Sequence, residues 1–262
     1  DTKKLPDGIV YCIGTVTEGV ISEGETADVI VDRERREDIA RNHTGTHLLQ
    51  AALRRVLGPQ VNQAGSLVLP DKLRFDFTWP EALTAKQLAE VEQLVNEQIW
   101  KATSLEICEM PIAEAKEKGA MALFGEKYGD IVRVVGIKDF SMELCGGSHV
   151  VNTGEIGSFR ITGEGGIGSG IRRIEAITGK AAYEAMKADR DLIHEMALRL
   201  KAKIEEIPEK MEKNLSALKE AERTIEKLKN QHTKDAMDDL LKNVQEKNGV
   251  SFFGAVVPAE NM

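Results

Sequence analysis

The sequence is poor in cysteine and in aromatic residues, and it has no long hydrophobic segment. Its 262 residues include three cysteines, an odd and widely spaced set that cannot form the disulfide framework of a small secreted protein. No apolar run approaches the ~18 residues that a membrane-spanning helix needs, and the charged start Asp1-Thr2-Lys3-Lys4 differs from a signal peptide. We therefore expect a cytoplasmic protein whose thiols are reduced.

Charged residues, in contrast, are abundant. They make up 30% of the chain, against 5% for aromatic residues, and this composition fits long exposed helices. The net charge of −8 argues against indiscriminate binding of polyanions. Local basic clusters at residues 33–41, 54–55 and 172–173 could still contact RNA, although such clusters are more often solvated faces of a fold.

Four side chains that can ligate a metal occur as two pairs with the same spacing. His43 and His47 lie four positions apart, and the dense apolar residues after them predict a helix ending at Gly58, so both imidazoles would lie on one helical face. Alone, this pair could be one packed and one solvated histidine, but Cys145 and His149 repeat the spacing. Three imidazoles and one thiolate suit zinc, so we expect one Zn²⁺ per chain.

Several missing motifs exclude other chemistries. The helix lacks the internal glutamate that serves as general base in H-E-x-x-H metalloproteases. Thr44 and Gly45 follow His43 instead, and neither can act as a general base. The glycine-rich run 163–170 lacks the G-K-[ST] ending and the G-x-G-x-x-G frame of nucleotide-binding loops, and we interpret it as a mobile loop beside the metal site. Cys12 and Cys108 lie in apolar or strand-like contexts and are expected to pack in the interior.

Five segments taken together resemble the editing region of alanyl-tRNA synthetases. They are Asn-His-Thr-Gly-Thr-His (42–47), Leu-Arg-Phe-Asp-Phe (73–77), Ala-Leu-Phe-Gly-Glu-Lys-Tyr-Gly-Asp (122–130), Glu-Leu-Cys-Gly-Gly-Ser-His (143–149) and Gly-Ile-Arg-Arg-Ile-Glu-Ala (170–176). The resemblance runs from about residue 5 to residue 180, and the tail resembles the next segment of the same enzymes. The four ligands alone would equally fit the editing domain of threonyl-tRNA synthetases.

The resemblance implies hydrolysis of the ester that joins a wrong amino acid to alanine tRNA, that is, of Ser-tRNA(Ala) and Gly-tRNA(Ala). It implies that Thr46 and Gln63 recognise the substrate, and we expect Cys145 to be a thiolate ligand in the catalytic centre. A site that hydrogen-bonds the serine hydroxyl can reject alanine by ~10⁴ or more, whereas a pocket shaped for alanine rejects serine only ~100-fold. Judged without the resemblance, Thr46 would bond its own helix and Gln63 would be an exposed strand residue.

We expect the acceptor end of tRNA(Ala) as the partner, contacted by Arg172 and Arg173. Four protein ligands form a closed site, so catalysis would require one of them to bind loosely, and we expect this of His149. No glutamate in the motifs is an obvious general base. No ATP-binding or adenylate-forming motif is visible, so we expect no aminoacylation from this chain.

Two alternative functions remain open. One is a free-standing trans-editing deacylase, and the other is a zinc-stabilised module that binds tRNA or forms oligomers without turnover. Three residues depart from the usual family pattern, namely Gly45 for alanine, Gln50 for histidine and Ser148 for threonine. Gly45 should loosen the helix by about 1 kcal/mol.

The order of predicted elements indicates an α+β fold, in which an antiparallel sheet and packed helices come after the end of a small β-barrel and precede a long helical hairpin. We predict helices over residues 33–57, 84–100 and 112–118. We predict strands over residues 9–13, 16–21, 27–32, 61–69, 73–77, 104–110, 130–135, 140–145, 156–161, 171–177 and 250–258.

The same pattern predicts four domains. Residues 1–34 would end a β-barrel, 35–180 form the zinc-dependent editing domain, 181–247 a helical hairpin, and 248–262 the start of a C-terminal domain that makes a homo-oligomer. Two apolar stripes separated at Pro208 predict the antiparallel hairpin, which Asn248-Gly249 would end. His194 and His232 lie among polar neighbours and should be surface residues. The missing initiator methionine suggests a piece of a larger protein.

Overall fold

The computed structural model describes residues 2–5, 9–122, 128–242, 244–252 and 254. The chain divides into two compact units, Asp1–Ala182 and Tyr183–Met262. The middle of the motif at 122–130 lies outside the described residues, as does the end of the strand expected from residue 250 to residue 258. Helices and antiparallel sheets alternate along the chain, which confirms the α+β class.

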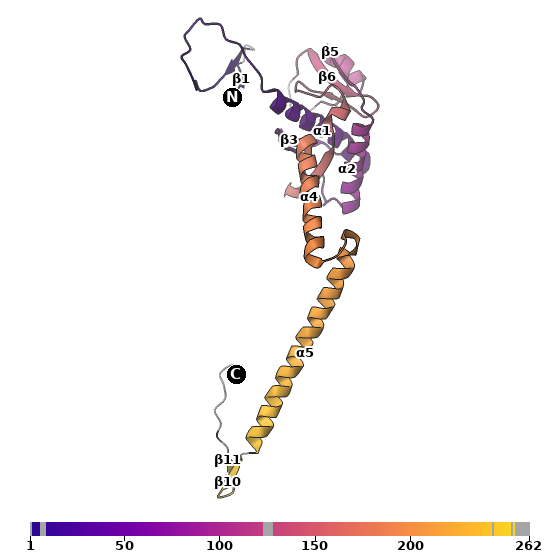
Figure 1. The fold of residues 1–262 in the computed structure, drawn as a ribbon. Helices are drawn as coiled ribbons and strands as arrows, with labels where there is room; N and C mark the ends of the chain where they lie inside the picture. The colour runs from indigo at the N-terminus through magenta and orange to yellow at the C-terminus, as the bar shows by residue number, and fades with distance from the viewer. Residues whose placement is uncertain (1, 6–8, 123–127, 243, 253, 255–262) are drawn as a thin grey trace. The chain divides into compact units, whose positions relative to one another are not determined.

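Helix α1 (Arg33–Leu57) carries the first ligand pair and crosses the interior of the first unit (Figure 1). It begins at Asp32, whose carboxylate accepts a backbone N–H of the first turn, and it ends at Gly58, whose φ of 115° favours glycine. Leu48 and Leu49 are fully buried. Both predicted ends of this helix are confirmed. They could be predicted since the apolar period and the glycine are local signals.

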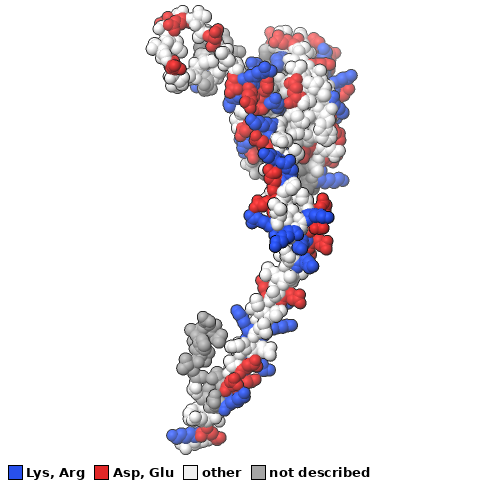
Figure 2. All heavy atoms as spheres, in the orientation of Figure 1, with Lys and Arg blue, Asp and Glu red and all other residues white. Residues whose placement is uncertain are grey.

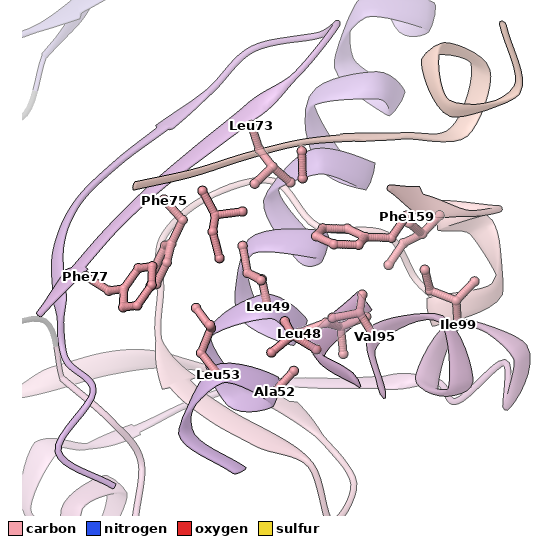
Figure 3. Packing of buried hydrophobic residues seen from close by; sticks show 14 of the residues in the cluster. Leu48, Leu49, Ala52, Leu53, Leu73, Phe75, Phe77, Val95, Ile99 and Phe159 are labelled. Atoms are coloured by element: carbon pink, nitrogen blue, oxygen red, sulfur yellow. The ribbon is translucent and has the colours of Figure 1, made fainter. Parts of the chain in front are cut away.

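The helices of the first unit pack on a four-stranded antiparallel sheet. Its strand order is β3 (Gln63–Val68), β4 (Leu73–Thr78), β9 (Ile171–Thr178), β8 (Phe159–Gly168). Phe75 and Phe77 of β4 share one buried cluster with Leu48 and Leu49 of α1 and Val95 of α2 (Ala85–Trp100) (Figure 3). This core fixes the position of α1, and therefore of the two histidines on it.

Helix α2 begins at the predicted position, and its first turn carries a capping box. The Thr84 hydroxyl accepts the backbone N–H of Gln87, and the Gln87 side chain accepts the backbone N–H of Thr84. The helix ends at Trp100. The side-chain amide of Asn96 donates to the Phe159 carbonyl in β8 and accepts from the Phe159 backbone N–H. These contacts attach α2 to the edge of the sheet.

A smaller antiparallel sheet brings the second ligand pair into place. It has the order β5 (Leu105–Pro111), β6 (Ile131–Ile137), β7 (Ser141–Leu144), with the short helix α3 (Ile112–Glu117) beside it. Val134 and Leu144 are buried in a separate small core. Because β7 ends at Leu144, Cys145 comes directly after the strand, one position beyond the strand end where we predicted it.

The glycine-rich run forms part of a strand, so its interpretation as a mobile loop was wrong. β8 extends to Gly168 and pairs with β9 through a turn at Gly170, whose φ is 70°. The register shifts between Ile161 and Gly163 and again between Gly166 and Gly168. Glycine tolerates such irregularities inside a ladder, which explains why the run can pair without side chains to pack. The 3₁₀ helix η1 (Thr153–Ile156) precedes β8, so the strand starts three residues later than predicted.

The N-terminal segment holds fewer strands than predicted. β1 (Thr2–Lys4) pairs with β2 (Val10–Cys12), and residues 13–32 form no strand. Their apolar side chains are exposed, for example Val20 at 86% and Ile30 at 90% of the accessible area. The alternation in the sequence predicts a strand correctly only where a partner strand exists, and two short strands are too few for a sheet that is stable on its own.

The second unit contains the two long helices predicted from the apolar stripes. Helix α4 (Gly179–Leu200), which begins within the first unit, ends before Lys201, whose φ is 49°. After the 3₁₀ helix η2 (Ile204–Glu206), α5 (Ile207–Leu241) begins with Pro208 as its second residue. The break therefore precedes the proline, which is well tolerated in the first turn of a helix.

Many apolar side chains of the two predicted stripes are exposed, for example Ile193 at 41% on α4 and Leu215 at 50% and Leu228 at 60% on α5. The antiparallel packing of α4 against α5 stays a prediction. Acidic and basic side chains are intermingled along α5 (Figure 2). His194 and His232 are exposed, as predicted. In the part of the chain that the structure describes, no helix combines the length and apolarity needed to cross a membrane.

The Asn248-Gly249 pair lies in a hairpin turn and does not end a helix, contrary to our prediction. It joins β10 (Gln245–Lys247) to β11 (Val250–Phe252). Both turn residues have positive φ, 55° and 77°, the conformation that Asn-Gly adopts in two-residue hairpins.

Candidate metal centre

The two predicted ligand pairs converge. His43 and His47 on α1 and Cys145 and His149 after β7 each offer one ligand atom, and these four atoms all lie within 4.8 Å of one another. The imidazole centroids of His43 and His149 are 4.3 Å apart. Residues about one hundred positions apart in the sequence therefore form one compact group of donors.

Hydrogen bonding from behind fixes which ring nitrogen of His43 faces the group. Its Nδ1 lies 3.2 Å from the backbone carbonyl oxygen of Ser148, which can only accept, so Nδ1 carries the proton. The unprotonated Nε2 lies 3.5 Å from Cys145 Sγ. The ring is thus held in the tautomer that a metal ligand requires.

His149 is fixed in the same way by Thr44, a residue to which the sequence assigned no role. The Thr44 hydroxyl donates its single proton to the Ala40 carbonyl at 2.9 Å, so it must accept from His149 Nδ1 at 3.1 Å. It also accepts the backbone N–H of Val150. The Nε2 of His149, left without a proton, lies 3.3 Å from Cys145 Sγ.

Behind His47 lies Glu143, a second residue without a predicted role. The His47 Nδ1 is 3.6 Å from Glu143 Oε2, too long for a hydrogen bond, and it has no other partner among the described residues. Burial raises the pKa of Glu143 to about 7, while a hydrogen bond from Ser141 opposes the rise. A carboxyl group behind a ligating histidine is the usual second partner in zinc proteins.

The turn that presents Cys145 is shaped by glycine and by an arginine. A β-carbon added to Gly147 would overlap the imidazole of His43, so only glycine lets the two segments meet. Arg133 of β6 donates to the carbonyl oxygens of Cys145 (2.7 Å) and Gly147 (2.9 Å), which holds the turn against the sheet.

The four residues fit a zinc ion. Zn–S and Zn–N bonds place tetrahedral ligand atoms about 3.4 to 3.6 Å apart, close to the two distances measured from Cys145 Sγ. Burial, with smaller effects from neighbouring histidines, lowers the pKa of His47 to about 3 and of His149 to about 2, and burial also lowers the pKa of His43. All three imidazoles are therefore neutral near pH 7, the form that binds a metal.

The two substrate residues implied by the family resemblance form hydrogen bonds outside this donor group. Thr46 is buried and its hydroxyl bonds the Asn42 carbonyl at 2.9 Å, the local helix bond expected without the resemblance. Gln63, at the start of β3, is half-buried and bonds Ser66 Oγ. Neither hydrogen bond involves one of the four ligands, so both roles stay predictions.

Arg172 and Arg173 are both held by carboxylates. Arg172 Nε donates to Glu164 at 2.6 Å, and Arg173 makes a two-bond ion pair with Asp76 at 2.7 and 2.8 Å. Cys12 and Cys108, which we expected in the interior, are exposed. They lie on short or edge strands, where alternation places side chains on an uncovered face.

Comparison with known proteins shows which proteins this chain is similar to. Residues 132–175 match the family described as the threonyl and alanyl tRNA synthetase second additional domain. Over its full length the chain is 46% identical to the alanine–tRNA ligase of Bacillus velezensis and 48% identical to that of Listeria welshimeri. Over 99% of its length it is 45% identical to the alanine–tRNA ligase of Desulforamulus reducens.

From end to end, the chain matches a region of alanine–tRNA ligases. It spans about 30% of the length of these curated relatives. The match to the second additional domain covers β6 to β9 and so includes Cys145 and His149, whereas His43 and His47 precede it. The candidate metal centre therefore combines two residues inside the matched family domain with two that precede it.

Proposed function

We propose that this region hydrolyses the ester bond of tRNA(Ala) that carries serine or glycine, at a zinc ion held by His43, His47, Cys145 and His149. The observation that supports this most is the convergence of three neutral imidazoles and a thiol, with two imidazoles held from behind in the ligating tautomer. When bound, zinc supplies a Lewis acid. The match to alanine–tRNA ligases supplies the substrate class.

The chain's own residues would orient the substrate and handle protons. Cys145 acts as a ligand and not as an acyl-forming nucleophile, because its sulfur belongs to the group of four donor atoms that converge within 4.8 Å of one another. Glu143 can hold a proton at its carboxyl oxygen near neutral pH, since burial raises its pKa to about 7. Because it lies behind His47, it is our candidate for the group that orients this imidazole toward the metal.

Substrate recognition is proposed for Thr46 and Gln63. Each carries a neutral polar group of the kind that can bond a serine hydroxyl, and Thr46 lies next to His47 on α1. For the acceptor end of the tRNA we retain Arg172 and Arg173 as sequence-based candidates. Their ion pairs with Glu164 and Asp76 mean that an RNA phosphate would have to compete with a carboxylate for each.

The test is hydrolysis of Ser-tRNA(Ala) and Ala-tRNA(Ala) by the zinc-loaded chain. We expect loss of serine and not of alanine, and we expect Cys145→Ala to abolish it. Cys108→Ala is the matched control, because this cysteine is exposed and lies outside the donor group. A folded, zinc-bound chain that hydrolyses neither ester would contradict the proposal.

A closed set of four ligands also supports a second candidate, a structural zinc site in a tRNA-binding module without turnover. The two candidates differ in what metal removal does. A structural site predicts that a chelator unfolds the first unit, whereas the editing proposal predicts a chain that loses hydrolysis and keeps its fold. Circular dichroism and the deacylation assay on the same chelated sample separate them.

A further inference from the structure

A cleft of about 860 Å³ opens beside the metal centre. One wall is the first turns of α1, and the other is the segment from Gly146 to Val151 that carries the ligand His149. Four arginines line it, namely Arg33, Arg36 and Arg41 of α1 and Arg133 of β6. A molecule bound in this cleft would therefore touch the edge of the metal centre.

Positive charge is in excess in the cleft. Its acidic lining residues are Glu37 and Glu155, fewer than the arginines. Arg33 pairs with Glu37, and Arg41 pairs with Asp38. Arg133 donates only to backbone carbonyls, and Arg36 forms no ion pair with any residue that the structure describes.

The arginines at the start of α1 do not stabilise the helix. Arg33, Arg35 and Arg36 lie in or next to the first turn, at the positive end of the helix dipole, where basic residues are unfavourable. The same end of a helix attracts anions. With the guanidinium of Arg133 on the facing wall, this arrangement suits an oxyanion that bridges the two walls.

We propose that this cleft binds a backbone phosphate of the RNA whose ester bond reaches the metal centre, with Arg36 as its main contact and Arg133 facing it. The inference rests on the proposed function, because it takes the ligand to be an aminoacylated RNA. It differs from the sequence-based assignment, since Arg172 and Arg173 are neutralised by carboxylates whereas Arg36 is not. A chain with net charge −8 would use such a local positive site to bind RNA specifically.

The test compares two neighbouring arginines of one helix. Arg36→Gln removes a cleft guanidinium, and Arg35→Gln removes the same charge from an exposed side chain that does not line the cleft. Binding of uncharged tRNA(Ala) is measured by fluorescence anisotropy over a range of salt concentrations. We expect Arg36→Gln to weaken binding ~10-fold. The slope of log binding constant against log salt concentration should become shallower by ~0.7 to 0.9, the value for one phosphate contact. Arg35→Gln should stay within about twofold of the unsubstituted chain.

Arg36→Lys gives a second comparison, because it keeps the charge and removes the planar fork. It should recover part of the affinity. Equal effects of Arg36→Gln and Arg35→Gln, an unchanged salt slope in Arg36→Gln, or no tRNA binding by the unsubstituted chain would overturn the inference. The tRNA in this binding assay carries no amino acid, so the assay does not depend on hydrolysis. Arg36-dependent binding without any ester hydrolysis would therefore uphold the cleft and contradict only the proposed function.

Discussion

Thr44 shows how one hydroxyl can set the chemistry of a metal ligand. Its proton is committed to the Ala40 carbonyl, so its lone pairs are left for the N–H groups of His149 and Val150. The hydrogen bond from His149 fixes which ring nitrogen faces Cys145, and the hydrogen bond from Val150 attaches the loop to α1. The role of such a residue lies in contacts across 105 positions of sequence, which no local motif records.

Replacing Thr44 by valine should weaken metal binding while keeping the volume of the side chain. We expect a loss of about 10- to 100-fold in zinc affinity, the usual effect of removing a partner from a ligating histidine. Thr44→Ser should retain most of the affinity. Thr46→Val is the matched control, since that hydroxyl bonds only the helix backbone. Competition with a chromophoric chelator measures all three, and equal affinities of Thr44→Val and Thr46→Val would contradict the assignment.

The buried titratable groups predict how stability of the metal-free chain depends on pH. The folded state lowers the pKa of the three ligating histidines, so their contribution is present above about pH 6.5 and is lost as the pH falls. Glu143 acts in the opposite direction. Its pKa is raised to about 7, so its contribution is present below about pH 4.5 and is lost as the pH rises through about 7.

We therefore expect the free energy of unfolding to fall from about pH 6.5 to about pH 5.5, because three histidines outweigh one glutamate. Each group contributes at most about 1.4 kcal/mol per pH unit. Glu143→Gln removes the opposing contribution and should steepen the dependence. Urea denaturation with a chelator present, at several pH values, gives both slopes. A slope that is flat, or that Glu143→Gln leaves unchanged, would show that these groups do not control stability.

At the scale of elements, the turn after β7 depends on the glycine at position 147. A β-carbon there would overlap the His43 ring, whereas one at Gly146 would meet nothing within 4 Å. We expect Gly147→Ala to displace the ring and abolish tight zinc binding with little change in the unfolding midpoint, because a side chain can move aside more cheaply than a backbone. Gly146→Ala should bind zinc normally. Isothermal titration with zinc separates the two, and normal binding by Gly147→Ala would contradict the geometry.

Elements with strong local signals could be predicted from the sequence. The apolar period and Gly58 define α1, and the Thr84 capping box defines the start of α2. The four ligands were predicted for the same reason, since both pairs carry their spacing in the sequence. The roles of Thr44, Glu143 and Arg133 were not predicted, because each acts through a partner from another element.

The failures share a physical cause, since pairing between strands is not local. Residues 163–168 looked like a loop because glycines have no side chains to pack, yet β9 supplies a partner strand. Residues 16–21 alternate as a strand would, yet no partner strand is present among the described residues. Gly45 was expected only to loosen α1. Its β-position lies 3.2 Å from a Thr178 methyl, so it also lets α1 approach β9 closely.

For the whole molecule, the division into two units predicts that metal binding does not require the second. All four ligands and the residues behind them lie before residue 183. A chain ending at Leu200, which keeps α4 whole, should fold and bind zinc with the affinity of the full chain. Thermal unfolding and zinc titration of both chains check this. Loss of folding or of zinc affinity in the shorter chain would show that the units depend on each other.

The proposed chemistry depends above all on His43, His47, Cys145 and His149 holding one metal ion. The absorption spectrum of the chain titrated with Co²⁺ is the decisive measurement, because it reports both coordination number and thiolate ligation. We predict saturation at one ion per chain, intense visible bands of a tetrahedral site and a thiolate charge-transfer band that Cys145→Ala removes and Cys108→Ala keeps. Weak bands of an octahedral ion, or a charge-transfer band that survives in Cys145→Ala, would contradict this ligand set.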